Sequence, residues 1–306
     1  MRLVFAGTPQ VAADTLTHLL DCGRHEVVAV LTRPDAPKGR SSRLQPSPVA
    51  ELARERGIEV LRPTGARDPE LAARLAELAP ECCPVVAYGG LIPRTLLDLP
   101  VHGWVNVHFS LLPRWRGAAP VQHAILAGDE VTGVTVFELV EALDAGPVLA
   151  SADYRLGAEE TAGEALVALQ RLGADLLVET LDALASGTAV ATPQPEAGVT
   201  LAPKLTVPGA RIDWSRPAVE IARQVRGNNP SPVAWTELDG ERLRVLVAAP
   251  APEAGLEPGE LRPGKREVLV GTGAGSLELR SVQPAGKRAL PAADWGRGLR
   301  GPGRFR

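Results

Sequence analysis

Short apolar runs alternate with capped helix starts through the first 108 residues, and this alternation restricts the possible fold more than any other feature of the chain. The runs expected to form buried strands are Arg2–Ala6, Glu26–Thr32, Pro84–Ala87 and Gly103–Val107. The helix starts between them pair a capping residue with a proline, and they are Thr8-Pro9, Ser47-Pro48 and Asp68-Pro69. Gly23 and Gly57 are the expected helix stops. Strands that alternate with helices form βαβ units, so the sequence predicts an α/β domain with a doubly wound, mostly parallel sheet.

The pattern changes after residue 160. Thr161-Ala162-Gly163-Glu164 is a capping box, and it begins an amphipathic helix that ends near Ser186-Gly187. Further along, Asp239-Gly240 supplies the positive φ angles of a type I′ hairpin turn. The strand candidates of this part are Ala234–Leu238, Glu241–Val247, Arg266–Val270 and Ser276–Val282. We therefore predict an α/β domain over residues 1–187, a Pro- and Thr-rich linker over 188–208, and a small OB-like β-barrel domain over 209–306.

Composition and cysteine usage exclude several classes of protein. Hydrophobic residues make up 45% of the chain and charged residues 23%, which is typical of a globular protein. No apolar run approaches the roughly 20 residues that a membrane span needs. The chain begins directly in a strand without a signal-peptide layout, so we expect a cytoplasmic protein with no membrane partner. The three cysteines form no CxxC pair and the five histidines show no ligand spacing, so neither a disulfide framework nor a metal site is predicted.

The charge is distributed unevenly along the chain. Residues 1–206 hold 17 Lys and Arg against 25 Asp and Glu, a net charge of −8, whereas residues 207–306 hold 16 against 11, a net charge of +5. A basic last third suggests an anionic partner in that region, although a random surface imbalance would give the same count.

One segment carries residues suited to acyl-transfer chemistry. Asn106 and His108 stand two positions apart at the end of a predicted strand, so their side chains should lie on the same face. Asp144, in the turn Leu143-Asp144-Ala145-Gly146, could bring a carboxylate to the same place. An amide, an imidazole and a carboxylate can together stabilise an oxyanion and transfer protons. From these residues alone, a structural histidine and an ordinary turn aspartate remain open as alternatives.

Ordered matches to one enzyme family run through the whole chain. Asn106-Val107-His108-x-Ser110-Leu111-Leu112-Pro113 closely resembles the signature of the formyltransferases that use 10-formyltetrahydrofolate. The next residues, Arg114–Pro120, resemble the version found in the branch that acts on methionyl-tRNA. Other matching segments are Phe5–Pro9, Arg33–Arg40, Leu44–Val49, Val85–Gly89, Arg211–Trp214 and Gln283–Arg288. The resemblance implies that residues 1–187 are the formyltransferase catalytic domain, with 10-formyltetrahydrofolate as formyl donor and no metal.

The same resemblance implies roles for individual residues. Asn106 and a protonated His108 would hydrogen-bond the oxyanion of a tetrahedral intermediate. Asp144 would favour the charged imidazole and assist proton removal from the attacking amine. The residues expected to bind folate are Ser110, Leu111, Leu112, Pro113, Tyr88 and Gly89. Phe109 departs from the glycine usual in the tRNA-acting branch, and its ring should either narrow the mouth of the site or pack against the domain body.

The acceptor implied by the resemblance is the α-amine of the methionyl initiator tRNA. Three features agree with an RNA partner: the basic loop over residues 33–45, the additional C-terminal domain and the excess positive charge of that domain. The residues expected to bind tRNA are Lys38, Arg40, Arg43, Lys287, Arg288 and Arg304. Arg40 matches a functional arginine of the family's loop. We expect the chain to act as a monomer.

Three other functions use the same residues. The acceptor could be an amino sugar nucleotide, although the basic loop and the Pro-Ala-Gly-Lys-Arg segment at 284–288 argue against it. The acceptor could be water, which would make the chain a formylfolate hydrolase. Finally, the chain could bind tRNA without any transferase activity, although the intact Asn106, His108 and Asp144 argue against this.

Overall fold

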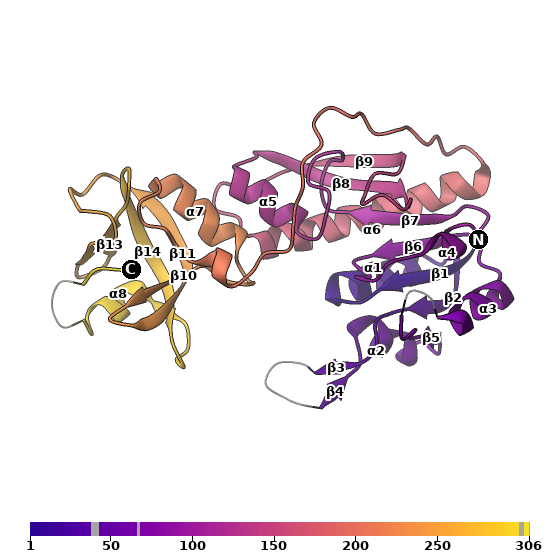
Figure 1. Cartoon of the computed structure of the whole chain (residues 1–306), viewed down its shortest axis with the longest axis horizontal. Coiled ribbons are helices and arrows are strands. Elements are labelled where there is room, and N and C mark those ends of the chain that lie inside the picture. The colour runs from indigo at the N-terminus through magenta and orange to yellow at the C-terminus, as the bar shows by residue number, and fades with distance from the viewer. Residues whose placement is uncertain (38–42, 66–67, 300–302, 306) are drawn as a thin grey trace. The chain divides into compact units, whose positions relative to one another are not determined.

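The computed structural model describes residues 1–306 except 38–42, 66–67, 300–302 and 306 (Figure 1). The chain divides into two compact units. Unit 1 comprises Met1–Pro120, Thr132–Tyr154 and Leu166–Leu201, and unit 2 comprises Val121–Val131, Arg155–Ala165 and Ala202–Arg306. Among the residues described, none of the helices combines the length and the apolar character that a membrane crossing requires.

A seven-stranded sheet forms the centre of unit 1, with the order β5-β2-β1-β6-β7-β8-β9. The strands are β1 (Arg2–Gly7), β2 (Glu26–Leu31), β5 (Glu59–Leu61), β6 (Cys83–Val86), β7 (Trp104–His108), β8 (Val131–Glu138) and β9 (Val148–Arg155). The first five in chain order are mutually parallel, and β8 is antiparallel to β7. This confirms the predicted doubly wound, mostly parallel sheet. The strand order reverses between β1 and β6, which is where ligands bind in such sheets.

The helices of unit 1 are α1 (Gln10–Cys22), α2 (Pro48–Glu55), α3 (Pro69–Leu78), α4 (Arg94–Leu97) and α6 (Ala162–Ser186). Three of these helices, α2, α3 and α6, begin where the capping signals predict, and α6 runs from the end of unit 2 into unit 1. The Ser47 hydroxyl accepts a hydrogen bond from the backbone N–H of Ala50 at 3.1 Å, and Asp68 caps α3 in the same way. Thr161 and Glu164 satisfy each other's backbone N–H groups, as a capping box requires.

One predicted cap is wrong. Pro9, not Thr8, is the N-cap of α1, and it offers no side-chain hydrogen bond. The Thr8 hydroxyl instead donates to the carbonyl of Tyr88 at 2.8 Å. Thr8 follows β1 and Tyr88 follows β6, so the hydroxyl joins the two loops at the reversal of strand order, and this long-range bond replaces the local cap.

Both faces of the sheet are covered. Consecutive residues of β1 from Leu3 to Gly7 are buried, whereas a half-solvated strand would alternate. On one face, Val4 and Ala6 pack with leucines of α3 and α4 in one apolar cluster. On another part of the sheet, Gly173 of α6 lies against Val107 of β7 and Val134 of β8. Side chains therefore cover β1 and pack against β7 and β8, the part of the sheet from which the residues described below emerge.

The segment predicted as a loop over residues 33–45 contains a short ladder. β3 (Ala36–Pro37) pairs antiparallel with β4 (Leu44–Gln45). The sequence offered no alternation to predict these strands, because each is only two residues long. The residues between the two strands lie largely outside the described part of the chain.

Unit 2 is built on an antiparallel sheet with the order β10-β11-β14-β13-β12, and β15 pairs with β14. Its strands are β10 (Trp235–Leu238), β11 (Glu241–Ala251), β12 (Leu261–Pro263), β13 (Val268–Gly271), β14 (Ser276–Pro284) and β15 (Leu290–Pro291). The predicted hairpin is confirmed, because β10 and β11 pair across Asp239 and Gly240, whose φ angles are 52° and 83°. The observed architecture is a half-barrel.

Unit 2 also contains helices, which are α5 (Pro120–Ala127), the 3-10 helix η1 (Pro208–Ala210), α7 (Ala218–Gly227) and α8 (Ala292–Gly296). Of these, α7 and α8 contribute residues to its apolar core. Ile221 and Val225 of α7 and Phe305 near the chain end join the inward residues of β11, β13 and β14 in one apolar cluster. Phe305 stacks on Trp214 with ring centroids 5.1 Å apart, so the chain end is tied into this core.

Candidate active site

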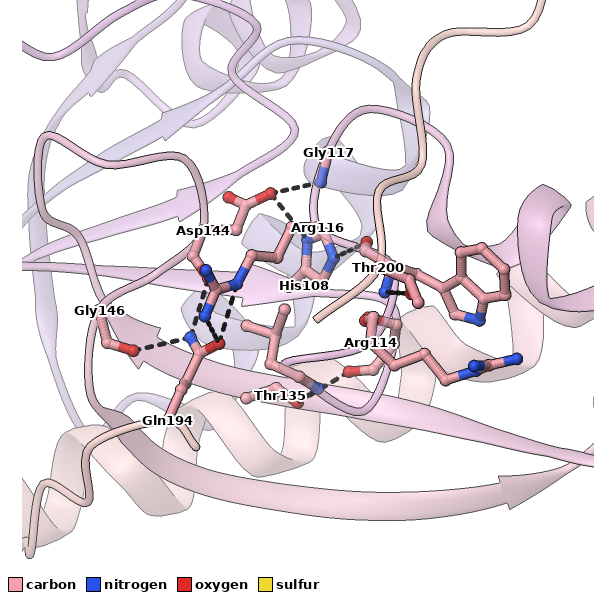
Figure 2. Close-up of polar contacts among 12 residues, drawn as sticks. His108, Arg114, Arg116, Gly117, Thr135, Asp144, Gly146, Gln194 and Thr200 are labelled. Atoms are coloured by element: carbon pink, nitrogen blue, oxygen red, sulfur yellow. Dashed lines mark hydrogen bonds and ion pairs between the residues drawn. The ribbon is translucent and has the colours of Figure 1, made fainter. Parts of the chain in front are cut away.

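His108 is the last residue of β7, at the carboxyl edge of the parallel sheet. Asn106 lies two residues earlier on the same strand, so the pleat places it on the same face, and it is half-buried where His108 is buried. Asp144 comes from the turn that joins β8 to β9 and faces the imidazole (Figure 2). The histidine and the aspartate are thus brought together from residues 36 positions apart.

The imidazole of His108 meets a different partner at each nitrogen. Nε2 lies 2.8 Å from the backbone carbonyl oxygen of Trp115, and Nδ1 lies 3.8 Å from Oδ2 of Asp144. A carbonyl can only accept, so Nε2 carries a hydrogen and donates it. In the neutral ring Nδ1 then has a free lone pair. The ring of Phe137 meets the imidazole edge-on, with centroids 6.3 Å apart.

Burial controls the charge of this histidine. Desolvation lowers the pKa of His108 below its ordinary value of 6.5, and it outweighs the Asp144 carboxylate and the Trp115 carbonyl, which both raise it. The ring is therefore neutral at pH 7 in the chain without substrate. A developing negative charge next to the ring would raise the pKa again, so a protonated His108 belongs to the reacting complex rather than to the resting site.

The Asp144 carboxylate is held by the backbone of the segment that follows the signature. Oδ2 of Asp144 accepts a hydrogen bond from the N–H of Gly117 at 2.7 Å, and the side chain is 12% exposed. Asp144 has a φ of 46° and Trp115 a φ of 65°, both in the left-handed region. The two residues that face the nitrogens of His108 are therefore both in conformations that need support from their surroundings.

The residues predicted to bind folate divide into two groups. Ser110 is fully buried, and its hydroxyl donates to the Arg114 carbonyl at 2.6 Å, so it shapes the turn rather than offering a free group. The N–H of Leu112 donates to the Thr135 hydroxyl at 3.1 Å. Leu111, Leu112 and Pro113 are half-buried and can offer apolar surface beside His108.

Tyr88 and Gly89 lie in the loop after β6, at the reversal of strand order. They line a cavity of about 340 Å³ together with Arg33, whose guanidinium donates to the Gly89 carbonyl at 2.9 Å. The other lining residues are Pro34, Pro63, Thr64, Gly65, Gly90 and Leu91. The cavity follows β6, and His108 ends the neighbouring strand β7. The lining of the cavity includes none of the catalytic trio Asn106, His108 and Asp144.

Phe109 packs against the body of unit 1. The residue is 7% exposed, and a Cβ at Gly173 of α6 would lie 3.6 Å from its ring. The sequence left open whether this ring narrows the mouth of the site or packs against the domain body. The structure shows that it packs against the domain body, beside α6.

The predicted tRNA-binding residues differ in exposure and in whether the structure describes them. Lys38 and Arg40 lie outside the described residues. Arg43 is exposed just before β4, and Lys287 and Arg288 are exposed in the turn between β14 and β15. The exposed Arg304 uses its guanidinium internally, donating to the Pro258 carbonyl at 3.0 Å and 3.1 Å.

Four residues that the sequence did not predict bond to His108 or Asp144, or to a residue that does. They are Trp115, Gly117, Gln194 and Thr200, and all of them act partly or wholly through long-range hydrogen bonds (Figure 2). No local pattern distinguishes them, because the bonds join positions far apart in the sequence. Across the part of the chain that the structure describes, no group of three or more His, Cys, Asp or Glu could hold a metal ion.

Comparison with known proteins gives the same assignment for both units. The family model described as formyl transferase matches residues 1–181, and the formyl transferase C-terminal domain matches residues 204–300. A methionyl-tRNA formyltransferase of Streptomyces coelicolor is 56% identical over 301 residues, which cover 98% of this chain and 97% of the relative. Proteins of the same name from Thermobifida fusca and Salinispora tropica are 54% and 52% identical, with the same coverage.

Solved structures agree in fold. The N-formyltransferase of Helicobacter canadensis, in complex with folinic acid and dTDP-3-aminofucose, superposes with a TM-score of 0.70 at 15% identity, covering 92% of this chain and 98% of that protein. HypX of Aquifex aeolicus in complex with tetrahydrofolic acid gives 0.64 at 22% identity, covering 96% of this chain and 46% of HypX. The chain therefore spans about half of the HypX protein, and at these identities the likeness concerns the fold alone.

A doubly wound domain with an amide, an imidazole and a carboxylate at its carboxyl edge, followed by an antiparallel half-barrel, defines a two-domain formyl transferase. Identity above 50% over almost the whole length narrows the class further. The chain belongs to the methionyl-tRNA formyltransferases.

Proposed function

We propose that this enzyme transfers the formyl group of 10-formyltetrahydrofolate to the α-amine of the methionyl initiator tRNA. The observation that carries the proposal is the buried imidazole of His108, whose Nε2 donates to the Trp115 carbonyl while Nδ1 faces Asp144. Such a ring can take a proton at Nδ1, and the carboxylate stabilises the imidazolium that forms. Relatives named for this activity match both units over nearly their whole length.

The proposed chemistry is direct transfer through a tetrahedral intermediate. The amine nitrogen bonds to the formyl carbon, whose C=O electron pair moves to the oxygen. The amide of Asn106 donates to that oxyanion, and the ring of His108 also stabilises it once the ring is protonated. Nδ1 of His108 takes a proton from the attacking nitrogen, and the same proton goes to N10 of tetrahydrofolate as the C–N10 bond breaks. His108 is then neutral again, so acceptor and donor have exchanged one proton for one formyl group.

The binding roles follow the predicted residues. Leu111, Leu112 and Pro113 would hold the folate beside His108, with Ser110 shaping the turn and with Tyr88 and Gly89 walling the neighbouring cavity. Lys38, Arg40, Arg43, Lys287 and Arg288 would contact tRNA phosphates, whereas Arg304 would support the chain end through Pro258. We further propose residues 1–187 as the catalytic domain, 188–208 as the linker and 209–306 as the tRNA-binding domain of a cytoplasmic monomer.

The test is transfer of labelled formyl from 10-formyltetrahydrofolate to methionyl initiator tRNA, with methionyl elongator tRNA as a parallel acceptor. Labelling of the initiator alone supports donor, acceptor and selectivity together. A dTDP-amino sugar and a reaction without any amine serve as two further arms. Labelling of the sugar, or consumption of formylfolate without an acceptor, would contradict the proposal in favour of the sugar enzyme or the hydrolase.

A further inference from the structure

A stretch of chain after α6 contacts the two residues that face the nitrogens of His108, because Gln194 bonds to Asp144 and Thr200 bonds to Trp115. From Val190 to Val199 every residue except Gln194 is exposed, and Thr200 is again half-buried. Both exceptions belong to unit 1, and both side chains point toward the segment around His108 (Figure 2). A stretch that only connected two elements would not require two polar side chains that point into the domain, so these two side chains are expected to have a further role.

The amide of Gln194 is completely used. Its oxygen accepts from Nε and Nη2 of Arg116 at 3.1 Å and 2.6 Å. Its nitrogen donates to the carbonyls of Asp144 and Gly146, both at 2.8 Å. Guanidinium donors on one side and carbonyl acceptors on the other leave only one orientation of the amide. One side chain therefore joins the segment after the signature to the turn that holds the catalytic carboxylate.

Thr200 acts on the other side of the imidazole. Its hydroxyl accepts from the N–H of Trp115 at 2.8 Å, and its carbonyl accepts from the N–H of Arg116 at 2.9 Å. Trp115 is the residue whose carbonyl receives the hydrogen of His108 Nε2. The hydroxyl thus fixes the peptide group adjacent to the one that orients the ring.

The two residues that Gln194 and Thr200 bind through the backbone are also the two residues beside His108 that have left-handed conformations. Asp144 and Trp115 have φ angles of 46° and 65°. A non-glycine residue persists in this region only where its surroundings hold it. Gln194 holds the carbonyl of Asp144, and Thr200 holds the N–H of Trp115, so each strained partner of the imidazole has one backbone group tied to the same short stretch of chain.

We propose that Gln194 and Thr200 are positioning residues of the formyl-transfer reaction, which place the Asp144 carboxylate and the Trp115 carbonyl on the two nitrogens of His108. These two side chains then support catalysis, whereas the exposed residues between them only connect one to the other. This inference rests on the proposed function. Neither residue touches the reacting atoms, because each acts through Asp144, Arg116 or Trp115.

The first experiment compares two matched sets of variants in the formylation assay. Gln194→Ala removes all four bonds, and Glu196→Ala changes an exposed side chain of the same stretch. Thr200→Val removes the hydroxyl without changing the shape, and Thr200→Ser restores it. We expect kcat to fall by about tenfold to a hundredfold in Gln194→Ala and Thr200→Val, with KM for tRNA within about twofold, because misplaced catalytic groups affect the chemical step. Glu196→Ala and Thr200→Ser should stay near the wild-type rate.

The second experiment does not depend on activity. The pKa of His108 is measured by NMR of histidine-labelled protein. Asp144 is the charged group that acts on this ring, and it raises its pKa, whereas the Trp115 carbonyl is neutral and the facing Phe137 cannot titrate. Displacing the Asp144 turn in Gln194→Ala should therefore lower the pKa of His108 further. His108→Gln assigns the resonance.

The outcomes separate the two proposals. If the wild-type chain does not formylate tRNA, the proposed function fails, and the NMR titration still decides whether Gln194 places Asp144. If Gln194→Ala and Thr200→Val keep the wild-type kcat and the His108 pKa is unchanged, the positioning proposal is wrong. A fall in the thermal midpoint alone would not support it, because residues that only hold the stretch in place affect stability and not kcat.

Discussion

Nε2 of His108 donates to the carbonyl oxygen of Trp115 across 2.8 Å, and this one bond decides which ring nitrogen is available for proton transfer. It leaves Nδ1 opposite Asp144, at 3.8 Å. A ring with both nitrogens free could act in either orientation. Here the protein backbone makes the choice, and the buried position makes the ring neutral at rest. The pH dependence of the enzyme should reflect both facts.

Asp144→Asn should weaken catalysis and shift its pH profile in a defined direction. The neutral His108 is the proton acceptor, so kcat/KM falls as pH drops through its pKa, which burial holds below 6.5. Asp144 raises that pKa, so removing its charge should move the acid limb to still lower pH, while the plateau falls by about a hundredfold. Asp153→Asn makes the same change on an exposed position of β9 and should do neither. A kcat/KM that falls as pH rises through the pKa of His108 would show that the protonated ring is the active form. An acid limb above pH 6.5 in the wild type, or an upward shift in Asp144→Asn, would contradict the effects assigned here to burial and to Asp144.

The same burial should appear in the stability of the protein. A histidine whose pKa is lower in the folded than in the unfolded state costs no stability above pH 6.5, and its penalty grows as pH falls from 6.5 through the folded pKa. His108→Gln does not titrate, so wild type should lose stability relative to this variant between pH 7.5 and 5.5. The measurement is urea unfolding of both proteins at the two pH values. His25 also has a lowered pKa but is present in both proteins, so its contribution cancels.

If the difference in unfolding free energy between wild type and His108→Gln stays constant with pH, the lowered pKa of His108 is contradicted. A constant difference would mean that the imidazole is solvated or already paired with a full charge. The His108 pKa would then be near its ordinary value, and the argument for a neutral proton acceptor would lose its basis.

Gly173→Val tests the packing beneath the catalytic strand. A Cβ at Gly173 would lie 2.9 Å from Cγ1 of Val107 and 3.2 Å from Cγ1 of Val134, both in the sheet under the site. A branched side chain there should destabilise the protein by about 1–3 kcal/mol, because the core has no room for it. Ala185→Val adds a branched side chain at an exposed position of α6 and controls for helix propensity. Equal urea midpoints for the two variants would show that the sheet yields easily at this point.

Local signals predicted the scaffold well, since their physics lies within a few residues. Ser47-Pro48, Asp68-Pro69 and the Thr161–Glu164 box mark helix starts in both sequence and structure. Asp239-Gly240 marks a turn for the same reason, because its positive φ angles depend on the residue type itself. Thr8 shows the limit, since a partner 80 residues away took the hydroxyl that a local cap would have used.

The candidate site was predictable only in its side chains that carry a signature. Asn106, His108 and Asp144 stand in recognisable segments, whereas Gln194 reaches Asp144 across 50 positions and Thr200 reaches Trp115 across 85. In a Pro- and Thr-rich stretch, no local sequence pattern distinguishes a glutamine that is hydrogen-bonded to the domain from one that is exposed to solvent. The Trp115 carbonyl is a backbone group, so its role depends on the fold and on no property of tryptophan.

The exposed pair Lys287 and Arg288 should contribute to tRNA binding through charge alone. Both lie in the turn between β14 and β15 of the half-barrel and are exposed there. Replacing both by alanine should weaken binding of initiator and elongator tRNA alike and reduce the slope of log Kd against log salt by roughly 2, because two phosphate contacts and their released counterions are lost. The matched control is Lys265→Ala with Arg266→Ala, which removes the same charge from the turn between β12 and β13. Filter binding of methionyl-tRNA over a salt series measures both slopes. Identical slopes for the two double variants would mean that the effect is the overall charge of the half-barrel and that Lys287 and Arg288 are not the contact.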